Sequence, residues 1–347
     1  MGESARLTVK EGTDSRPRAR IGVVIPYFQR EAGLLHRALS SVAAQEHRPV
    51  QVVVVDDGSP RPAAEEITPQ LHDPLPGLTV ILQANRGIAA ARNAALDALT
   101  PEVSAVALLD SDDYWEPSHL RHAAAALSLG ADFFFSNSRD EGAAADLFQT
   151  RDRLRDLLGS GRVVPDAPSV AEWRGGISPL FARGCPFMTS TVVFRRALMP
   201  ELRFPLEFRR AVEDHAAFWE LLTRSSVIMF CTEPTLVSGS AGIGTYRNST
   251  YGTPADLIKL ADELRLFRRL VSSPLLTPGD RRLMQVGIAA RRRGALGSAL
   301  HMLRRRQNVV SELAYLLRSD PTCAASWCVD LPKLLFTKAS GRPFTVD

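Results

Sequence analysis

Residues 50–57 read VQVVVVDD, a run of β-branched residues that ends in two acids. The run is short and nearly continuous rather than alternating, which is typical of a strand buried on both faces, as in a parallel sheet. Four further runs have the same character: IGVVIPYF (21–28), LTVILQ (78–83), VSAVALLD (103–110) and ADFFFSN (131–137). We therefore expect these segments to form the strands of a parallel sheet.

Helical segments lie between the predicted strands. Segments 87–99 (GIAAARNAALDAL) and 116–130 (EPSHLRHAAAALSLG) are rich in helix formers, and the second ends in a capping glycine. In segment 31–45, one helical face collects Leu35, Ala38, Leu39 and Val42. Strands that alternate with helices in this way predict βαβ units. The expected fold is therefore α/β, with a doubly wound, mainly parallel sheet flanked by helices.

The rest of the chain has a weaker pattern. Residues 1–20 are polar and basic without periodicity, so we expect a disordered leader. Residues 140–184 mix Gly, Pro, Asp and Arg, which favours loops and short helices. Beyond residue 254 the chain is predicted to be helical, and the segment RRRGALGSALHMLRRR resembles one helix-turn-helix unit. Two more strand candidates flank a helix expected near 212–224, namely MTSTVVF (188–194) and SVIMFCTEP (226–234).

The composition is that of an ordinary globular protein. The chain has 347 residues, of which 45% are hydrophobic, so it can form one large domain with an appendage, or two domains. No apolar stretch approaches the roughly 20 residues that a spanning helix needs. The N-terminus lacks the apolar centre of a signal peptide, so we expect a cytoplasmic location. The four cysteines have neither metal-type nor disulfide-type spacing and are expected to be reduced, structural thiols.

Acidic residues gather where two predicted strands end. Asp56 and Asp57 follow one strand, and Asp110, Asp112 and Asp113 follow another within ALLDSDDYWEP (107–117). Ligands bind beyond the carboxyl ends of strands in an open parallel sheet. Such sequences are also common turns, but two of them at one sheet edge favour a divalent cation. Mg²⁺ or Mn²⁺ would accept carboxylate oxygens, bridge to substrate phosphates and offset the repulsion between the acids.

The spacing within the second acidic group distinguishes its members. Asp110 and Asp112 are in D-x-D spacing, so both can reach one side of an extended turn, and Asp113 is expected to turn elsewhere. Close to this edge, Gly87 starts a predicted helix whose amides could face an anion, with Arg86 and Arg92 adding positive charge. The alternative is a loop glycine with two solvated arginines.

Five motifs together resemble a known family. In chain order they are VVIPYFQRE, VVVVDDGSP, NRGIAAARNAAL, LLDSDDYWEP and VEDHAAFWELL. They resemble the inverting, nucleotide-sugar-dependent glycosyltransferases of family 2, which have the GT-A fold. The segment VVIPYFQREAGLLHRALSSVAAQ is especially similar to the glucosyltransferases of succinoglycan-type exopolysaccharide assembly.

The resemblance covers about residues 20–252 and implies a division of the chain. Residues 21–252 would form the GT-A catalytic domain, with a nucleotide-binding half at 21–137 and an acceptor half at 138–252. Residues 253–347 match no motif and would form a basic helical extension.

The resemblance also implies roles for single residues. Asp57 would accept a hydrogen bond from the uracil ring, and Asn85 and Arg92 would hold the nucleotide and its phosphates. Asp112 would bind the metal directly, with Asp110 beside it and the ribose. Nucleotide-sugar contacts would come from Pro26, Phe28, Glu31, Asp57, Asn85, Gly87, Arg92, Asp110, Ser111 and Arg247.

The general base would be Asp214, with Glu213 as the alternative. Two departures matter: Gln29 stands where the family often has Asn, and no His follows TYRNSTYG (245–252), so a third metal ligand stays open. The stretch GTYRNSTYG (244–252) could be a lid over the donor, with Arg247 near the diphosphate, or a plain surface loop.

The implied activity is metal-dependent, inverting transfer of one hexose, such as glucose, from a UDP-sugar. The acceptor would be a hydroxyl of a saccharide, in particular a lipid-linked exopolysaccharide or other surface-polysaccharide intermediate. The Q-x-x-R-W motif of processive synthases is absent, which favours single-sugar addition.

Two alternatives remain. A sugar-nucleotide pyrophosphorylase would carry a Gly-rich loop where this chain has IPYFQRE, and a non-catalytic nucleotide-binding module would be expected to have lost some acids.

The tail carries the positive charge of the chain. Residues 271–347 contain 12 Lys and Arg against 5 Asp and Glu, with arginine clusters at 291–293 and 304–306. The helices could pack on the catalytic domain with a solvated arginine face, or rest on anionic lipid at the inner face of the cytoplasmic membrane. Nucleic acid is not expected as a partner, because no aromatic platform accompanies the arginines.

The sequence is compatible with a homo-oligomer. Three aromatic residues could form an acceptor surface or belong to the core: Trp173, Phe181 and Phe187.

Overall fold

The computed structural model describes residues 19–339 apart from a few gaps. The gaps are residues 73, 76, 151–158, 160, 166, 183, 184, 186, 199 and 240–248. The predicted leader therefore lies outside the described residues except for its last two positions. Arg247 and most of the predicted lid also lie outside them.

A parallel set of strands forms one half of the sheet. The strands are β1 (Ile21–Tyr27), β2 (Gln51–Asp56), β3 (Leu78–Leu82) and β4 (Ala105–Leu108), in the order β3-β2-β1-β4. Every residue of β1, β2 and β4 is buried, as their continuous apolar runs predicted. Because β2 lies on one side of β1 and β4 on the other, the chain reverses direction across the sheet between β1 and β4. Open α/β sheets bind ligands at such a reversal point, beyond the carboxyl ends of the strands.

The second half of the sheet is mixed. Its strands are β5 (Tyr114–Trp115), β6 (Phe133–Asp140), β7 (Arg162–Val164), β8 (Ala167–Trp173), β9 (Val193–Arg195) and β10 (Ile228–Ser238). Strand β9 lies antiparallel between β4 and β6, and β10 pairs parallel with β6. Strands β7 and β8 correct the expectation of only loops and short helices at 140–184. The run 188–194, predicted as one strand, begins with a 3₁₀ turn at Thr189–Thr191 before the short β9.

Helices cover both faces of this sheet. On one face, α1 (Leu34–Ala43) and α4 (His119–Ser128) pack on inward residues such as Val52 and Val54. On the other, α3 (Ile88–Asp97) and α8 (Glu213–Arg224) pack with Val53 and Val55. Short elements complete the domain: 3₁₀ turns at Ala63–Glu65 and Arg196–Leu198, and helices α2 (Pro69–His72), α5 (Leu147–Thr150) and α7 (Ser178–Ala182).

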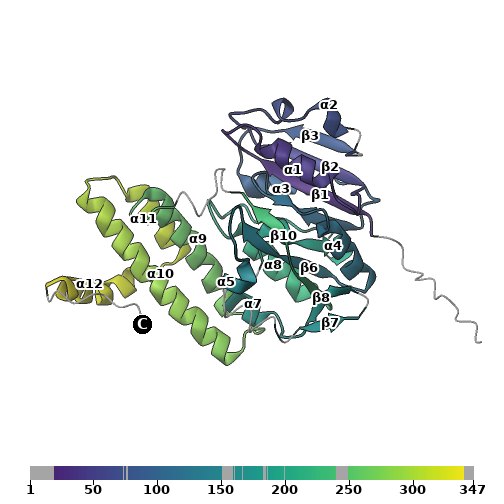
Figure 1. The fold of residues 1–347 in the computed structure, drawn as a ribbon. Coiled ribbons are helices and arrows are strands. Elements are labelled where there is room, and N and C mark those ends of the chain that lie inside the picture. Colours follow the sequence, from purple (N-terminus) through teal and green to yellow (C-terminus); the bar gives the residue numbers. More distant parts are fainter. Residues whose placement is uncertain are drawn as a thin grey trace, which may run out of the picture.

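Four helices gather at one side of the sheet domain (Figure 1). They are α9 (Pro254–Val271), α10 (Pro278–Arg304), α11 (Val310–Ser319) and α12 (Cys323–Ala339). Helices α9 and α10 each begin with a threonine that accepts a hydrogen bond from a backbone N–H three residues on, followed by proline at the first helical position. The helix-turn-helix interpretation of residues 291–306 is wrong, because α10 runs unbroken through Gly294 and Gly297 to Arg304. Gly297 serves packing instead, since a Cβ there would lie 2.7 Å from the Tyr251 hydroxyl oxygen.

The C-terminal helices share the core of the sheet domain. Leu266 and Leu270 of α9 and Met284 of α10 belong to the same buried cluster as Leu221 of α8. At the start of α10, buried Asp280 accepts a hydrogen bond from Ser178 Oγ of α7 at 2.7 Å. Trp173, Phe181 and Phe187 are buried in this cluster, so they belong to the core rather than to an exposed acceptor surface. No described helix combines the length and the apolar character that a bilayer crossing requires.

Candidate active site

The two acids after β2 have different tasks. Asp56 accepts hydrogen bonds from the backbone N–H groups of Ser59 and Ala63, both at 2.8 Å, so it is a turn former. Asp57 accepts from the N–H groups of Arg86 and Gly87, also at 2.8 Å. The anion that faces the start of α3 is therefore the protein's own Asp57 carboxylate, which suits the positive end of the helix dipole. This contact fixes the loop before α3 against the loop after β2.

The other predicted nucleotide-sugar residues that the structure describes lie at or just beyond the carboxyl ends of β1, β3 and β4. Pro26 is buried within β1, and Phe28 just beyond it is half-buried. Ser111 is buried and accepts a hydrogen bond from Gln29 Nε2 at 3.1 Å. Glu31, Asn85 and Gly87 are exposed at the same edge of the sheet. The structure thus brings these residues to one edge, and their contacts with a nucleotide stay predictions.

The acidic turn after β4 separates its three aspartates. Asp110 keeps 27% of its side chain exposed, and Asp112 is half-buried. Asp113 is buried and turned away, as predicted, and accepts hydrogen bonds from Ser190 Oγ (2.7 Å) and from the Gly239 N–H (3.1 Å). Burial, together with the charges of Asp112 and Asp110, raises the pKa of Asp113 to about 7. The turn therefore leaves two aspartates partly exposed, and the third forms hydrogen bonds with neighbouring segments.

The end of β10 lies directly against this turn. A Cβ on Gly239 would lie 1.9 Å from the backbone carbonyl oxygen of Asp112, so only glycine fits there. The same carbonyl accepts a hydrogen bond from Arg37 Nη2 of α1 at 3.1 Å. The end of β10 and helix α1 therefore both contact the backbone of the D-x-D turn.

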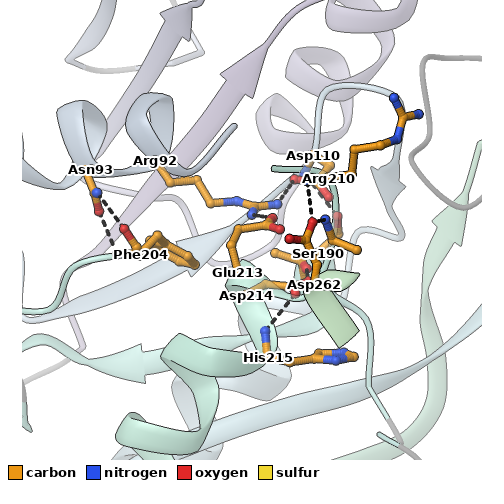
Figure 2. Close-up of polar contacts among 12 residues, drawn as sticks. Arg92, Asn93, Asp110, Ser190, Phe204, Arg210, Glu213, Asp214, His215 and Asp262 are labelled. Carbon is orange, nitrogen blue, oxygen red and sulfur yellow. Dashed lines mark hydrogen bonds and ion pairs between the residues drawn. The ribbon is translucent and has the colours of Figure 1, made fainter. Parts of the chain in front are cut away.

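Arg92 of α3 joins the acidic turn to the start of α8 (Figure 2). Its Nη2 lies 2.8 Å from Asp110 Oδ1, and its Nη1 lies 2.7 Å from Glu213 Oε1. Only 2% of the arginine side chain is exposed. A direct contact with phosphate, as the resemblance implied, would require one of these ion pairs to open, and this role of Arg92 stays a prediction. Burial and the neighbouring Asp214 raise the pKa of Glu213 above its ordinary value, and Arg92 offsets only part of that rise.

Asp214 is the more accessible member of the acidic pair. Its Oδ2 accepts a hydrogen bond from Thr189 Oγ1 at 2.5 Å, and its Oδ1 accepts from the His215 N–H at 2.7 Å. Asp214 is partly exposed, whereas Glu213 is 7% exposed. Burial acts to raise the pKa of Asp214, but the charges of His215 and Arg92 outweigh it, so the pKa lies below its ordinary value. Asp214 is therefore ionised at neutral pH, which is the state a general base needs.

His215 supplies the positive charge beside Asp214. Burial acts to lower the pKa of His215, but the Asp214 carboxylate and Cys185 raise it to about 10. The imidazole ring packs edge-on against Phe181, with ring centroids 6.4 Å apart. His215, Thr189, Ser190, Arg37 and Gly239 all contact the site residues, and the sequence did not single them out. Only His215, next to the acidic pair, had a local signal that could have drawn attention to it.

Comparison with known proteins identifies the family of the chain. The family model described as Glycosyl transferase family 2 matches residues 22–167. The succinoglycan biosynthesis protein ExoW of Rhizobium meliloti (strain 1021) is 32% identical over 240 residues, which are 68% of this chain and 73% of that protein. The chain belongs to glycosyl transferase family 2. It is a glycosyltransferase, so the pyrophosphorylase and the non-catalytic module are no longer needed as alternatives.

Solved structures confirm the GT-A fold. S. aureus TarS 1–349 in complex with UDP-GlcNAc aligns with a TM-score of 0.59 at 16% identity, covering 94% of this chain and 93% of that one. The mannosyltransferase PcManGT from Pyrobaculum calidifontis, in complex with GDP-Man and Mn²⁺, aligns with a TM-score of 0.53 at 19% identity, covering 94% and 89%. At these identities the likeness shows the fold alone.

The Arg92 bridge generates a prediction about stability. Arg92→Met keeps an unbranched, apolar stem but removes the guanidinium, which leaves Asp110 and Glu213 without their cation. We expect the free energy of unfolding to fall by about 3–5 kcal/mol, measured by urea denaturation. Without Arg92 the pKa of Glu213 in the folded state should rise further above its unfolded value. A carboxyl group whose pKa is raised by folding stabilises the folded state less as the pH rises. The free energy of unfolding of the variant should therefore be lower at pH 8 than at pH 5.

The matched control is Arg203→Met, which removes an exposed ion pair with Asp97. It should change the free energy of unfolding by less than about 1 kcal/mol. A deficit in Arg92→Met that is equal to the control, or independent of pH, would contradict the bridge as the element that holds these two acids.

Proposed function

We propose that this glycosyltransferase moves one hexose, such as glucose, from a UDP-sugar to a saccharide hydroxyl with inversion at the anomeric carbon. The observation that carries the proposal is the Arg92 bridge, which sets the D-x-D turn and the Glu213–Asp214 pair side by side. A site for the leaving diphosphate thus adjoins a site for the base. The relative named for succinoglycan biosynthesis and the UDP-GlcNAc complex of TarS support a UDP-sugar donor and a polysaccharide-type acceptor.

The acidic turn fits a divalent cation. Asp110 and Asp112 would hold it, since both residues are partly exposed and their carboxylates offer hard oxygen ligands. Mg²⁺ and Mn²⁺ take few protein ligands when substrate phosphates complete their coordination. When bound, the ion would neutralise charge that develops on the diphosphate. The mannosyltransferase with GDP-Man and Mn²⁺ supports this choice of metals.

The proposed base is Asp214. An acceptor hydroxyl must lose its proton as it attacks the anomeric carbon on the face opposite the diphosphate, and this geometry produces inversion. The hydrogen bonds from Thr189 Oγ1 and from the His215 N–H orient the Asp214 carboxylate for that proton. Glu213 is less suited to the task, because its carboxylate is buried and paired with Arg92.

The metal and donor proposal can be tested by calorimetry. Wild-type protein should bind UDP more tightly in the presence of Mn²⁺ than in its absence. Asp112→Asn should lose that gain and at least about 10²-fold in the rate of UDP-sugar turnover, because a key electrostatic group is removed. Asp97→Asn, an exposed acid away from the turn, is the control. A variant at position 112 that keeps more than about a tenth of the wild-type rate would place the metal elsewhere.

The base assignment has its own test. Asp214→Asn should abolish sugar transfer while the affinities for UDP and Mn²⁺ stay within about twofold, because the base contacts the acceptor and not the nucleotide. Glu213→Gln is the comparison variant. It removes the carboxylate that pairs with Arg92, so it should mainly lower the free energy of unfolding. If Glu213→Gln reduces kcat more than Asp214→Asn does, the roles within the pair are reversed.

The basic end of α10 supports a membrane contact, although not through both arginine clusters. Arg291 pairs with Glu263 at 2.6 Å, and Arg292 pairs with the buried carboxylate of Asp320, also at 2.6 Å. These internal pairs correct the expectation that both clusters are available to lipid. The second cluster, Arg304, Arg305 and Arg306, is exposed and is flanked by Leu303 (52% exposed) and Val310 (71% exposed). We propose that this end rests on anionic lipid, which would bring the enzyme to a lipid-linked acceptor at the inner face of the cytoplasmic membrane.

Cosedimentation with phosphatidylglycerol-containing vesicles tests this contact. Each arginine near an anionic surface is worth about 1 kcal/mol, so changing positions 304–306 to Gln should weaken binding about 10²-fold at low salt. Binding of the wild type should disappear at high salt, because the attraction is screened. The control replaces three exposed arginines of the catalytic domain, Arg174, Arg203 and Arg224, with Gln. Equal loss in the two triple variants would refute a specific role for the end of α10.

A further inference from the structure

A buried carboxylate of the C-terminal helices holds the loop that leads to the proposed base. Asp262 of α9 is fully buried and accepts hydrogen bonds from three consecutive backbone N–H groups. The donors are Arg209 (3.1 Å), Arg210 (2.7 Å) and Ala211 (3.1 Å). Figure 2 shows Asp262 near the start of α8, beside the Glu213–Asp214 pair.

The loop needs this support because it ends in an unfavourable backbone conformation. Val212, directly before Glu213, has φ 61°, in the left-handed region that β-branched residues rarely adopt. Such a conformation costs on the order of 1–3 kcal/mol and persists only where surrounding contacts impose it. Val212 is also the N-cap of α8, and its carbonyl oxygen accepts the hydrogen bond from the Ala216 N–H. Its backbone therefore sets the direction in which Glu213 and Asp214 leave the loop.

A second helix of the extension supports the same contact. The Tyr315 hydroxyl of α11 hydrogen-bonds to Asp262 and lies 2.9 Å from the carbonyl oxygen of Glu207. The Arg209 guanidinium stacks over the Tyr315 ring, 4.5 Å from its centroid. Burial raises the pKa of Asp262 above its ordinary value, and the hydrogen bonds from Tyr315 and from the loop amides oppose that rise. The Asp262 carboxylate therefore accepts hydrogen bonds from Tyr315 and from the loop amides, and these bonds fix the loop at residues 209–211.

We propose that Asp262 is a positioning residue for the base: through loop 209–211 and Val212 it places the Asp214 carboxylate at its site beside Thr189. This inference rests on the proposed role of Asp214. A displacement of about 1 Å at a reacting group can cost about 10²-fold in rate, so a distant anchor of this kind can control turnover. The C-terminal helices would then be part of the catalytic unit.

The test compares two buried aspartates of the extension. Asp262→Asn keeps the shape but leaves one acceptor oxygen for several N–H donors. We expect kcat for UDP-sugar turnover to fall about 10- to 100-fold. KM for the UDP-sugar and Kd for UDP should stay within about twofold, because the residues predicted to bind the nucleotide-sugar lie near the ends of β1–β4 and not in this loop. Amide hydrogen exchange at residues 209–211 should become faster. The control is Asp320→Asn: Asp320 is equally buried but pairs with Arg268 and Arg292 inside the extension, so the change should lower Tm and leave kcat unchanged.

Several outcomes would overturn the inference. They are equal kcat in the two Asn variants at a temperature where both are folded, a rise in KM for the UDP-sugar at unchanged kcat, or unchanged exchange at 209–211. If Asp262→Asn does not fold, Tyr315→Phe removes one hydrogen bond to the same carboxylate. It should show a smaller fall in kcat together with faster exchange at 209–211, and the absence of both effects would also overturn the inference.

The experiment separates this inference from the proposed function. A wild-type protein without sugar transfer, or an Asp214→Asn variant with full activity, would refute the function. The exchange measurement at 209–211 reports on the Asp262 anchor without any turnover.

Discussion

The candidate active site depends on how two acids from distant segments can lie close together. Asp110 follows β4 and is partly exposed, whereas Glu213 begins α8 and is buried, where a charge is costly without a partner. Arg92 resolves this by placing one guanidinium between them, with an N–O distance of less than 3 Å on each side. Removing Arg92 would leave the buried Glu213 carboxylate without its cation, so the two ion pairs hold helix α3, the acidic turn and helix α8 together. The partly exposed acids of the turn and Asp214 take their positions from these contacts.

The antiparallel direction of β9, in the mixed half of the sheet, brings further polar groups to these acids. Parallel strands bring their carboxyl ends to one edge, whereas the antiparallel β9 brings its amino end to the same edge. The 3₁₀ turn before β9 therefore lies beside the acids. Ser190 accepts a hydrogen bond from the Asp110 N–H and donates one to Asp113, while Thr189 donates to Asp214. The 3₁₀ turn that leads into this antiparallel strand thus supplies the hydroxyl groups that hydrogen-bond to acids from both segments.

The sequence was informative where the physical signal is local. The parallel strands, α1, α3, α4 and α8, and the acids at the ends of β2 and β4 followed from continuous apolar runs, helical spacing and D-x-D spacing. The resemblance to family 2 added the pair at 213 and 214. Strands β7 and β8 were missed because their segment is rich in Gly, Pro and charged residues. The partners of Arg92 and of Asp262 could not be found, because their contacts join residues between 18 and 121 positions apart, and nothing local distinguishes Asp262 from any polar residue of a surface helix.

Helix α10 gives the protein a built-in length. Its 27 residues span about 40 Å at 1.5 Å per residue. One end is tied to the catalytic domain through Asp280 and Ser178, and the other ends at the exposed arginines. A continuous helix resists compression, so in the proposed membrane contact it would act as a spacer between the sheet domain and the lipid surface. Each added or deleted turn would then change that separation by about 5.4 Å, and the reach of the enzyme toward a lipid-linked acceptor would be a property of helix length.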